Sequence, residues 1–386
     1  MALIDLIAGA RPNFMKIAPI VEALHAAEAR GGPLRYRIVH TGQHYDRNMS
    51  GAFFEQLGIP EPDFNFGVGG GTQAEQAGGI MRAYESLLRE TSSDLCLVVG
   101  DVTSTMSCAI TARKMWVPVA HVEAGIRSGD MTMPEEVNRI VTDSLTNYFF
   151  TTSEIANENL RRGGASEECI FFVGNTMIDT LLRNRDRFVK PPCWDAIGLD
   201  GGGACRFLVL TLHRPANVDE EHKLGRMLEA IVGHAQGVPI VFPVHPRTRA
   251  VLDRSGIRFP NLHAVEPLGY LEFNYLVSRA FGVITDSGGI TEETTVLGIP
   301  CLTLRDNTER PETITLGTNE LVGTDPAGIP PVLDRLMNGR WKTGCVPPLW
   351  DGRTGPRIVE HLERLLNPEN RPGRAPEAAK IIARGK

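Results

Sequence analysis

Three acidic residues in the first half of the sequence have the types and the spacing that acid–base catalysis needs. Asp101 follows the apolar run Leu95–Val99 and one glycine, and Glu123 directly follows a second apolar run, Val117–Val122. Glu135 comes shortly afterwards. Carboxyl groups that share a cleft raise one another's pKa, so one can donate a proton and another can accept one near neutral pH. We therefore predict that these residues form the acid–base group of an enzyme.

The elements around these residues must bring them to one place. Each apolar run is typical of a buried strand, and the segment between them has a helical pattern. Ligands of parallel α/β sheets bind beyond the carboxyl ends of the strands, so Asp101 and Glu123 are expected to face one cleft. Structural interpretations also exist. Asp101 could cap the next helix, Glu135 could complement a helix dipole, and Glu123 could pair with Arg127.

Strands alternate with helices along the whole chain, in two series. Further strands are predicted at residues 3–8, 36–41, 148–151 and 169–173, and in the second half at 207–211, 240–243, 262–265 and 282–285. A stretch rich in Pro and Gly after residue 190 separates the two series. The predicted fold class is α/β, with two doubly wound, Rossmann-like domains that face each other across a cleft. We assign residues 1–188 to the first domain, 189–366 to the second and 367–386 to a basic tail, and the last helix, about 357–366, could cross back to the first domain.

Composition limits what the protein binds. The chain has 386 residues, 42% of them apolar, and a formal net charge of -6, which gives no electrostatic footprint for nucleic acid. We find no signal peptide and no apolar run near the ~18 residues of a membrane helix, so we expect no membrane partner. Seven scattered cysteines, without a CxxC pair or suitably spaced histidines, favour a reduced, cytoplasmic protein without a bound metal.

A turn in the second half is a candidate anion site. Ser287, Gly288 and Gly289 begin a predicted helix directly after a predicted strand. Bare amide groups and the helix dipole at such a start attract negative charge, although a tightly capped helix would use the same residues. His213 and Arg214 follow another predicted strand of this half, where apolar packing ends.

A series of motifs occurs in order along the chain: GARPNFMK, TGQHYD, VGDVTST, HVEAGIRSGDMTMPEEVNR, LTLHRP, VHPR, TDSGGITEE and RDNTERPE. In this combination the chain resembles the non-hydrolysing UDP-N-acetylglucosamine 2-epimerases, over about residues 3–366. The resemblance implies a two-domain fold of the glycosyltransferase-B type, a homodimer, and a UDP-sugar bound between the domains without any cofactor. It also implies interconversion of UDP-GlcNAc and UDP-ManNAc, by elimination of UDP to a 2-acetamidoglucal and re-addition of UDP.

The resemblance assigns roles to the matching residues. The implied catalytic residues are Asp101, Glu123, Glu135 and His213. The residues implied to bind UDP or the sugar are Arg11, Lys16, Arg214, Phe273, Ser287, Gly288, Gly289, Glu293 and Arg310. Simpler interpretations are a solvated Lys16, an apolar helix contact for Phe273 and a surface ion pair for Arg310. Glu292, which precedes Glu293, is expected to be a surface charge.

The chain departs from the family pattern at a regulatory position. Many bacterial members have Arg-Gln-Thr where this chain has Gly70-Gly71-Thr72, and that Arg helps to hold a second, activating UDP-GlcNAc. Gln43, His44 and Glu136 are retained. We therefore expect a weakened or different regulatory site.

Several other functions fit the same residues. The same chemistry could act on another UDP-2-acetamido sugar, such as a UDP-2,3-diacetamido uronic acid, or the enzyme could hydrolyse its substrate and release free sugar. A glycosyltransferase is a further alternative, since fold does not fix function. A nicotinamide-dependent epimerase is disfavoured because no GxGxxG motif follows a predicted strand. Product analysis would separate these alternatives.

Overall fold

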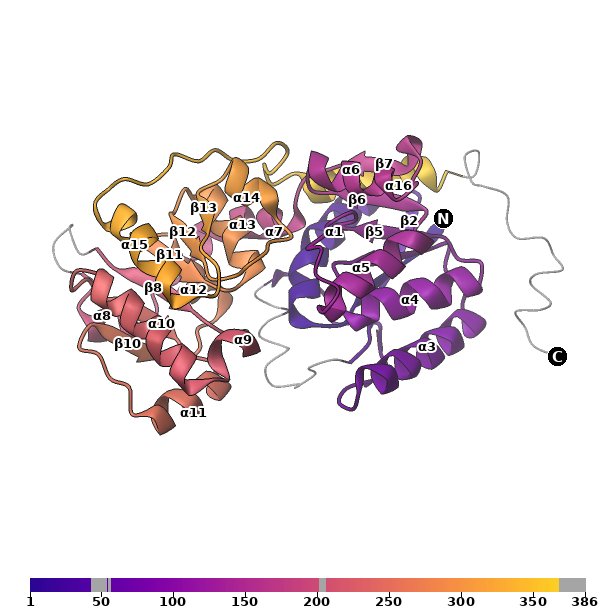
Figure 1. Ribbon diagram of the computed structural model, residues 1–386. Coiled ribbons are helices and arrows are strands. Elements are labelled where there is room, and N and C mark those ends of the chain that lie inside the picture. The colour runs from indigo at the N-terminus through magenta and orange to yellow at the C-terminus, as the bar shows by residue number, and fades with distance from the viewer. Residues whose placement is uncertain (43–53, 55–56, 201–205, 368–386) are drawn as a thin grey trace. The chain divides into compact units, whose positions relative to one another are not determined.

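The computed structural model describes residues 1–42, 54, 57–200 and 206–367, and the chain divides into two compact units (Figure 1). Unit 1 comprises Met1–Thr180 together with the chain from Pro348 onward, and unit 2 comprises Leu181–Pro347. Unit 1 is therefore discontinuous in sequence, whereas unit 2 is one continuous stretch. The helix predicted at residues 48–57 falls largely outside the described residues.

A seven-stranded sheet with the order β3-β2-β1-β4-β5-β6-β7 forms the centre of unit 1, and all of its strands are parallel. The strands are β1 (Ala2–Ala8), β2 (Leu34–His40), β3 (Phe64–Asn65), β4 (Leu95–Val99), β5 (Val119–Val122), β6 (Tyr148–Thr151) and β7 (Ile170–Phe172). The helices are α1 (Arg11–Ala29), α3 (Gln73–Glu90), α4 (Thr103–Lys114), α5 (Pro134–Leu145), α6 (Glu154–Arg162), most of α7 (Thr176–Asn184) and α16 (Thr354–Leu365), with a 3-10 turn at Glu167–Cys169. The strand order reverses between β1 and β4, and ligands of such sheets bind at that point.

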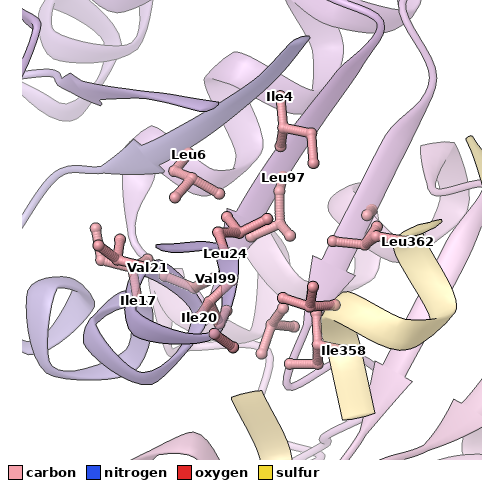
Figure 2. Packing of buried hydrophobic residues seen from close by; sticks show 14 of the residues in the cluster. Ile4, Leu6, Ile17, Ile20, Val21, Leu24, Leu97, Val99, Ile358 and Leu362 are labelled. Atoms are coloured by element: carbon pink, nitrogen blue, oxygen red, sulfur yellow. The ribbon is translucent and has the colours of Figure 1, made fainter. Parts of the chain in front are cut away.

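The core of unit 1 lies between the central strands and two helices that are far apart in sequence (Figure 2). From α1, Ile17, Val21 and Leu24 share one helix face and point into this cluster. From α16, Ile358 and Leu362 enter it at helical spacing. The apolar faces of both helices thus cover the same side of the sheet.

Contacts in the first turn of α16 also hold this helix against the rest of unit 1. The amide of Gly355 donates a hydrogen bond of 2.8 Å to Asp179 Oδ2, which satisfies one of the donors left open at a helix start. A Cβ on Gly355 would lie 2.3 Å from the carbonyl oxygen of Pro19 in α1, so only glycine lets the two helices approach this closely. Helix α16, near the end of the described chain, therefore completes a core to which β1 and α1, at its beginning, also contribute.

Unit 2 is built around a six-stranded parallel sheet with the order β10-β9-β8-β11-β12-β13. Its strands are β8 (Leu208–Thr211), β9 (Ile240–Pro243), β10 (Leu262–Val265), β11 (Gly282–Thr285), β12 (Cys301–Thr303) and β13 (Asn319–Leu321). Its helices are α8 (Cys193–Ile197), α9 (Pro215–Val218), α10 (Glu221–His234), α11 (Pro246–Ser255), α12 (Tyr270–Val277), α13 (Gly288–Leu297), α14 (Pro311–Thr315) and α15 (Ile329–Met337), with 3-10 turns at Arg185–Arg187 and Pro326–Gly328. The order reverses between β8 and β11. The prediction of an α/β protein with two doubly wound parallel sheets is confirmed.

A buried polar network joins β1, β2 and α3 in unit 1. Asp5 is fully buried, and its carboxylate accepts hydrogen bonds from Nε of Arg37 (2.5 Å) and from the hydroxyls of Tyr84 (2.8 Å) and Ser93 (2.8 Å). A carboxylate is tolerated in a core only when donors take up its oxygens in this way. The network therefore fixes α3 on the sheet.

Replacing Tyr84 with phenylalanine should lower the free energy of unfolding by about 1–3 kcal/mol, because one donor to the buried Asp5 is lost. Urea denaturation monitored by circular dichroism measures the change. Tyr36→Phe is the matched control, since the Tyr36 hydroxyl bonds to His25 near the surface and its loss should cost less than about 1 kcal/mol. Equal losses in the two variants would contradict the role given to the network.

Candidate active site

Lys16 and Glu123 form a shielded ion pair at the carboxyl ends of the central strands of unit 1. Lys16 Nζ lies 2.8 Å from Glu123 Oε2, and the two side chains are 12% and 2% exposed. The amine also lies against Gly100, where a Cβ would come within 2.7 Å of it. Glu123 follows β5 directly and has a φ of 69°, a left-handed conformation that is unusual for a residue other than glycine. The pairing of Glu123 with Arg127 is wrong, because Arg127 pairs with Asp143.

Asp101 lies at the neighbouring strand exit, just beyond β4, and faces a cation on α5. Its Oδ2 accepts hydrogen bonds from Nη2 (2.5 Å) and Nε (3.1 Å) of Arg139. The interpretation of Asp101 as a helix cap is wrong, because Val102 is the N-cap of α4 and no side chain caps that helix. The structure therefore pairs the carboxylates Asp101 and Glu123 with two different cations.

Glu135 and Glu136 lie in the first turn of α5. Glu135 is half-buried, whereas Glu136 is buried and accepts hydrogen bonds from the amides of Ser128 (2.9 Å) and Gly129 (3.0 Å). Burial raises the pKa of Glu136, but these bonds and the guanidinium of Arg139 outweigh it, so the pKa lies below its usual value. Arg139 thus bridges the ionised Glu136 and Asp101, with 2.7 Å between its Nη1 and Glu136 Oε2. The regulatory role of Glu136 stays a prediction.

A buried histidine that the motif analysis did not single out links β4, β5 and α5. His121 Nε2 lies 2.8 Å from the carbonyl oxygen of Gly100, and Nδ1 lies 2.7 Å from Asp143 Oδ1. Because a carbonyl oxygen only accepts, Nε2 is the donor to Gly100. Burial raises the pKa of Asp143, but His121 and Arg127 together lower it below its usual value. This network fixes the backbone just before Asp101, and the sequence signal for it was a histidine inside an apolar strand.

Three of the residues predicted from sequence cannot be assigned a side-chain environment. Arg11 begins α1, but its side chain lies outside the described part of the structure. Gln43 and His44 lie outside the described residues altogether. The phosphate- or sugar-binding role of Arg11 and the regulatory roles of Gln43 and His44 stay predictions.

In unit 2 the exits of β8 and β11 bring His213, Arg214 and Asp286 together. Asp286 is fully buried and accepts hydrogen bonds from the amides of His213 (3.1 Å) and Arg214 (2.9 Å), and His213 Nδ1 lies 2.7 Å from it. Burial raises the pKa of Asp286, but His213 and its other donors outweigh burial and lower it. The contact through Nδ1 leaves Nε2 of the half-exposed His213 ring as the nitrogen that can meet a ligand. Asp286 was not predicted, although it stands inside the TDSGG motif.

The predicted anion site is at the start of α13. Ser287 is the N-cap of this helix but makes no side-chain capping hydrogen bond, and Ser287, Gly288 and Gly289 are all half-buried. The start of α13 is therefore not closed by its own N-cap side chain, which contradicts the interpretation as a capped helix. In the same helix Glu293 is buried, and burial raises its pKa to about 7, although Tyr270 and Asn274 partly oppose the shift.

The burial and the contacts of the polar and aromatic residues around α13 agree only in part with the prediction. Glu292 is 1% exposed and forms an ion pair with Arg310, so the expectations of a surface charge at Glu292 and a surface ion pair for Arg310 are wrong. The physical reason is that Arg310, 18 residues later, folds back over α13 and compensates the buried charge. Phe273 on α12 is partly buried and packs against the apolar cluster that contains Trp194, in agreement with the helix-contact interpretation.

The described residues contain no cluster of three or more His, Cys, Asp or Glu side chains that could hold a metal ion. The search for membrane spans, made over the same part of the chain, found no helix long and apolar enough to cross a bilayer.

Comparison with known proteins identifies the family. The model of the UDP-N-acetylglucosamine 2-epimerase family matches residues 26–363. The chain belongs to this family. The resemblance predicted from the motifs is thereby confirmed. The relatives of this UDP-N-acetylglucosamine 2-epimerase family member include epimerases named for two different UDP-sugars.

The first of these relatives is the UDP-N-acetylglucosamine 2-epimerase of Methanocaldococcus jannaschii, which is 38% identical over 374 residues, 93% of this chain and 98% of the relative. The second is a UDP-2,3-diacetamido-2,3-dideoxy-D-glucuronate 2-epimerase of Pseudomonas aeruginosa, 41% identical over 320 residues, 82% of this chain and 87% of the relative. The crystal structure of the Methanocaldococcus jannaschii enzyme in complex with UDP-GlcNAc and UDP matches with a TM-score of 0.81, over 94% of this chain and 99% of that one.

Proposed function

We propose that this protein is an isomerase, a non-hydrolysing 2-epimerase that interconverts UDP-GlcNAc and UDP-ManNAc. Its family membership and the ligands named in the structure of its Methanocaldococcus jannaschii relative support this function. The observation that carries the proposal is the placement of Asp101 and Glu123 at adjacent strand exits, each beside a different cation. Acids and bases held in different electrostatic surroundings can take opposite roles in proton transfer.

The reaction breaks two bonds and then forms them again. One carboxylate takes the proton from C2 of the sugar while the bond between C1 and the diphosphate oxygen breaks, which leaves a 2-acetamidoglucal and UDP. An acid then delivers a proton to the opposite face of C2, and the UDP oxygen bonds to C1 again. We assign the proton transfers to Asp101, Glu123 and Glu135. His213, Arg214 and the start of α13 stabilise the departing diphosphate.

The decisive experiment follows the proton at C2. The purified protein is incubated with UDP-GlcNAc in deuterated water and monitored by proton and phosphorus NMR. Deuterium at C2 in a growing population of UDP-ManNAc is the expected result. Free sugar with accumulating UDP would instead show hydrolysis, and an unchanged spectrum with UDP-GlcNAc would refute the proposed substrate.

A second candidate keeps the mechanism and changes the sugar. The specific observation is the 41% identity to the Pseudomonas aeruginosa epimerase, which is named for a UDP-2,3-diacetamido uronic acid. That sugar carries a second acetamido group and a carboxylate, so its site needs additional donors. Running the same NMR experiment with both nucleotide sugars and comparing kcat/KM decides between the two substrates.

Glu293 should make nucleoside binding dependent on pH. We propose that its carboxylate accepts hydrogen bonds from the ribose hydroxyls, which favours its ionised form. Because burial raises the pKa of Glu293 to about 7 in the free protein, binding at pH 7 should release up to about half a proton, and affinity should fall as the pH drops below about 7. Calorimetry with uridine, in two buffers of different ionisation enthalpy, measures this release. Uridine has no phosphate that titrates in this range, and Glu293→Gln should abolish the release.

The assembly and the location of the enzyme are further parts of the proposal. We infer a homodimer from the family resemblance and a cytoplasmic enzyme from the scattered cysteines in the sequence. Light scattering coupled to size-exclusion chromatography tests the first inference. A monomer at micromolar concentration would contradict it.

A further inference from the structure

Arg305 is a buried cation with unused donors. It follows β12 in unit 2 and is 3% exposed. Its Nη2 donates to Glu309 (2.6 Å) and to Asn307 (3.2 Å), whereas no acceptor among the described residues forms a hydrogen bond with Nε or Nη1. Buried polar groups are normally satisfied, and a charged group left partly unsatisfied is expensive. The two nitrogens therefore suggest a place for acceptors that a ligand brings.

One of the unused donors, Nη1, lies beside the start of α13. Arg305 Nη1 would be 3.4 Å from a Cβ placed on Gly288, the first residue of that helix. Gly288 has no side chain to separate the guanidinium from the helix backbone. A helix start attracts anions, and the N-cap Ser287 does not cap this one with its side chain. Two independent features of the chain thus favour an anion at the same point.

A carboxylate of the chain lies at this point as well. Glu309 Oε1 would be 3.0 Å from the same Cβ on Gly288, and Glu309 Oε2 accepts the hydrogen bond from Arg305 Nη2. The Glu309 side chain is 11% exposed, so the ion pair is largely shielded from water. Carboxylates and phosphates are alternative partners for a guanidinium, because both can accept its N–H groups in the same planar arrangement.

We infer that Arg305 is a phosphate-binding residue and that Glu309 is an internal anion which competes with the phosphate. A nucleoside diphosphate at the start of α13 supplies oxygens to Nη1 of Arg305, and the charge of Glu309 opposes its binding. The inference rests on the proposed function for the identity of the ligand. It adds two residues to the site, neither of which was singled out by the motif analysis.

The test compares two ligands that differ only in the diphosphate. Calorimetry measures Kd for UDP and for uridine with the wild type and with the variants Arg305→Gln and Glu309→Gln. Arg305→Gln should weaken UDP binding by about 10- to 100-fold, as expected for lost charge-assisted hydrogen bonds, and change uridine binding by less than about 2-fold. Glu309→Gln should strengthen UDP binding by about 2- to 10-fold without changing uridine binding, because the competing charge is gone.

The matched control is Arg254→Gln on the surface of the same unit, where Arg254 pairs with Glu221 and its side chain is 62% exposed. This variant should bind both ligands like the wild type. Unchanged UDP binding by Arg305→Gln, or equal losses for UDP and uridine, would overturn the inference. If Arg305→Gln does not fold, Glu309→Gln decides: stronger UDP binding supports the inference, and unchanged or weaker binding overturns it. A wild type that binds neither ligand would instead refute the proposed function.

Discussion

Replacing Glu123 with glutamine is expected to lower kcat by about 10²- to 10⁴-fold while UDP still binds. Glutamine keeps the shape of the side chain but can neither take nor deliver a proton. Lys16, which lies 2.8 Å from the Glu123 carboxylate, would then face an uncharged amide, so its positive charge would lose its counter-charge. Steady-state rates from coupled NMR or chromatography and Kd for UDP from calorimetry separate the loss of chemistry from a loss of binding.

Asp101→Asn and Glu135→Gln should act in the same direction, because the reaction needs proton transfer on both faces of C2. The matched control is Glu158→Gln on α6, whose exposed carboxylate pairs with Arg162. This control should keep the wild-type rate. Wild-type turnover in all three active-site variants would refute the site in unit 1.

The second large effect is expected for Asp286→Asn. The Asp286 carboxylate accepts hydrogen bonds from the backbone amides of His213 and Arg214 and contacts the ring nitrogen Nδ1 of His213. An asparagine at this position would point an NH₂ group at some of these donors. His213 should then lose its fixed orientation, and kcat/KM should fall by about 10²- to 10³-fold. The matched control is Asp325→Asn, which alters an exposed carboxylate bonded only to a nearby backbone amide among the contacts described.

The same variant changes how stability depends on pH. The pKa of Asp286 is lower in the folded protein than in the unfolded chain, so its contribution is present above the unfolded value of about 4 and is lost as the pH falls through the folded value. Urea denaturation from about pH 3 to pH 7 should show this loss in the wild type and a weaker one in Asp286→Asn. Identical pH profiles would contradict the role of Asp286 as an ionised acceptor. A fall in kcat/KM without any change in the NMR signals of the His213 ring would contradict the role of Asp286 in orienting that ring.

The sequence was sufficient for the fold class because most strands are apolar runs of four or more residues bounded by turn residues. The run Leu95–Val99 is a clear example and forms β4, and the predicted run Val117–Val122 contains β5 (Val119–Val122). β3, β12 and β13 were not predicted, because two or three residues carry too little periodicity to be recognised. These short strands form because a neighbouring strand offers them hydrogen bonds.

The sequence predicted that Asp101 and Glu123 follow neighbouring strands, but it did not predict the partners of these side chains. Glu123 pairs with Lys16 across 107 residues of sequence, and nothing local distinguishes that partner from the nearby Arg127. His121 meets Asp143 22 residues later, from a neighbouring helix. Glu292 is buried for a similar reason, since its compensating Arg310 comes from another element. Charges close in sequence are a poor guide to pairing when the sheet brings distant strand exits together.

The return of α16 to unit 1 has a consequence for how the chain is made. Unit 2 is continuous, so all of its residues have left the ribosome before α16 does. Ile358 and Leu362, which complete the core against α1, are among the last residues of the described chain to emerge. Domains usually fold in the order of synthesis. In this protein the half that is translated first must wait, with the part of its core that α16 covers still exposed, until the half translated second is complete.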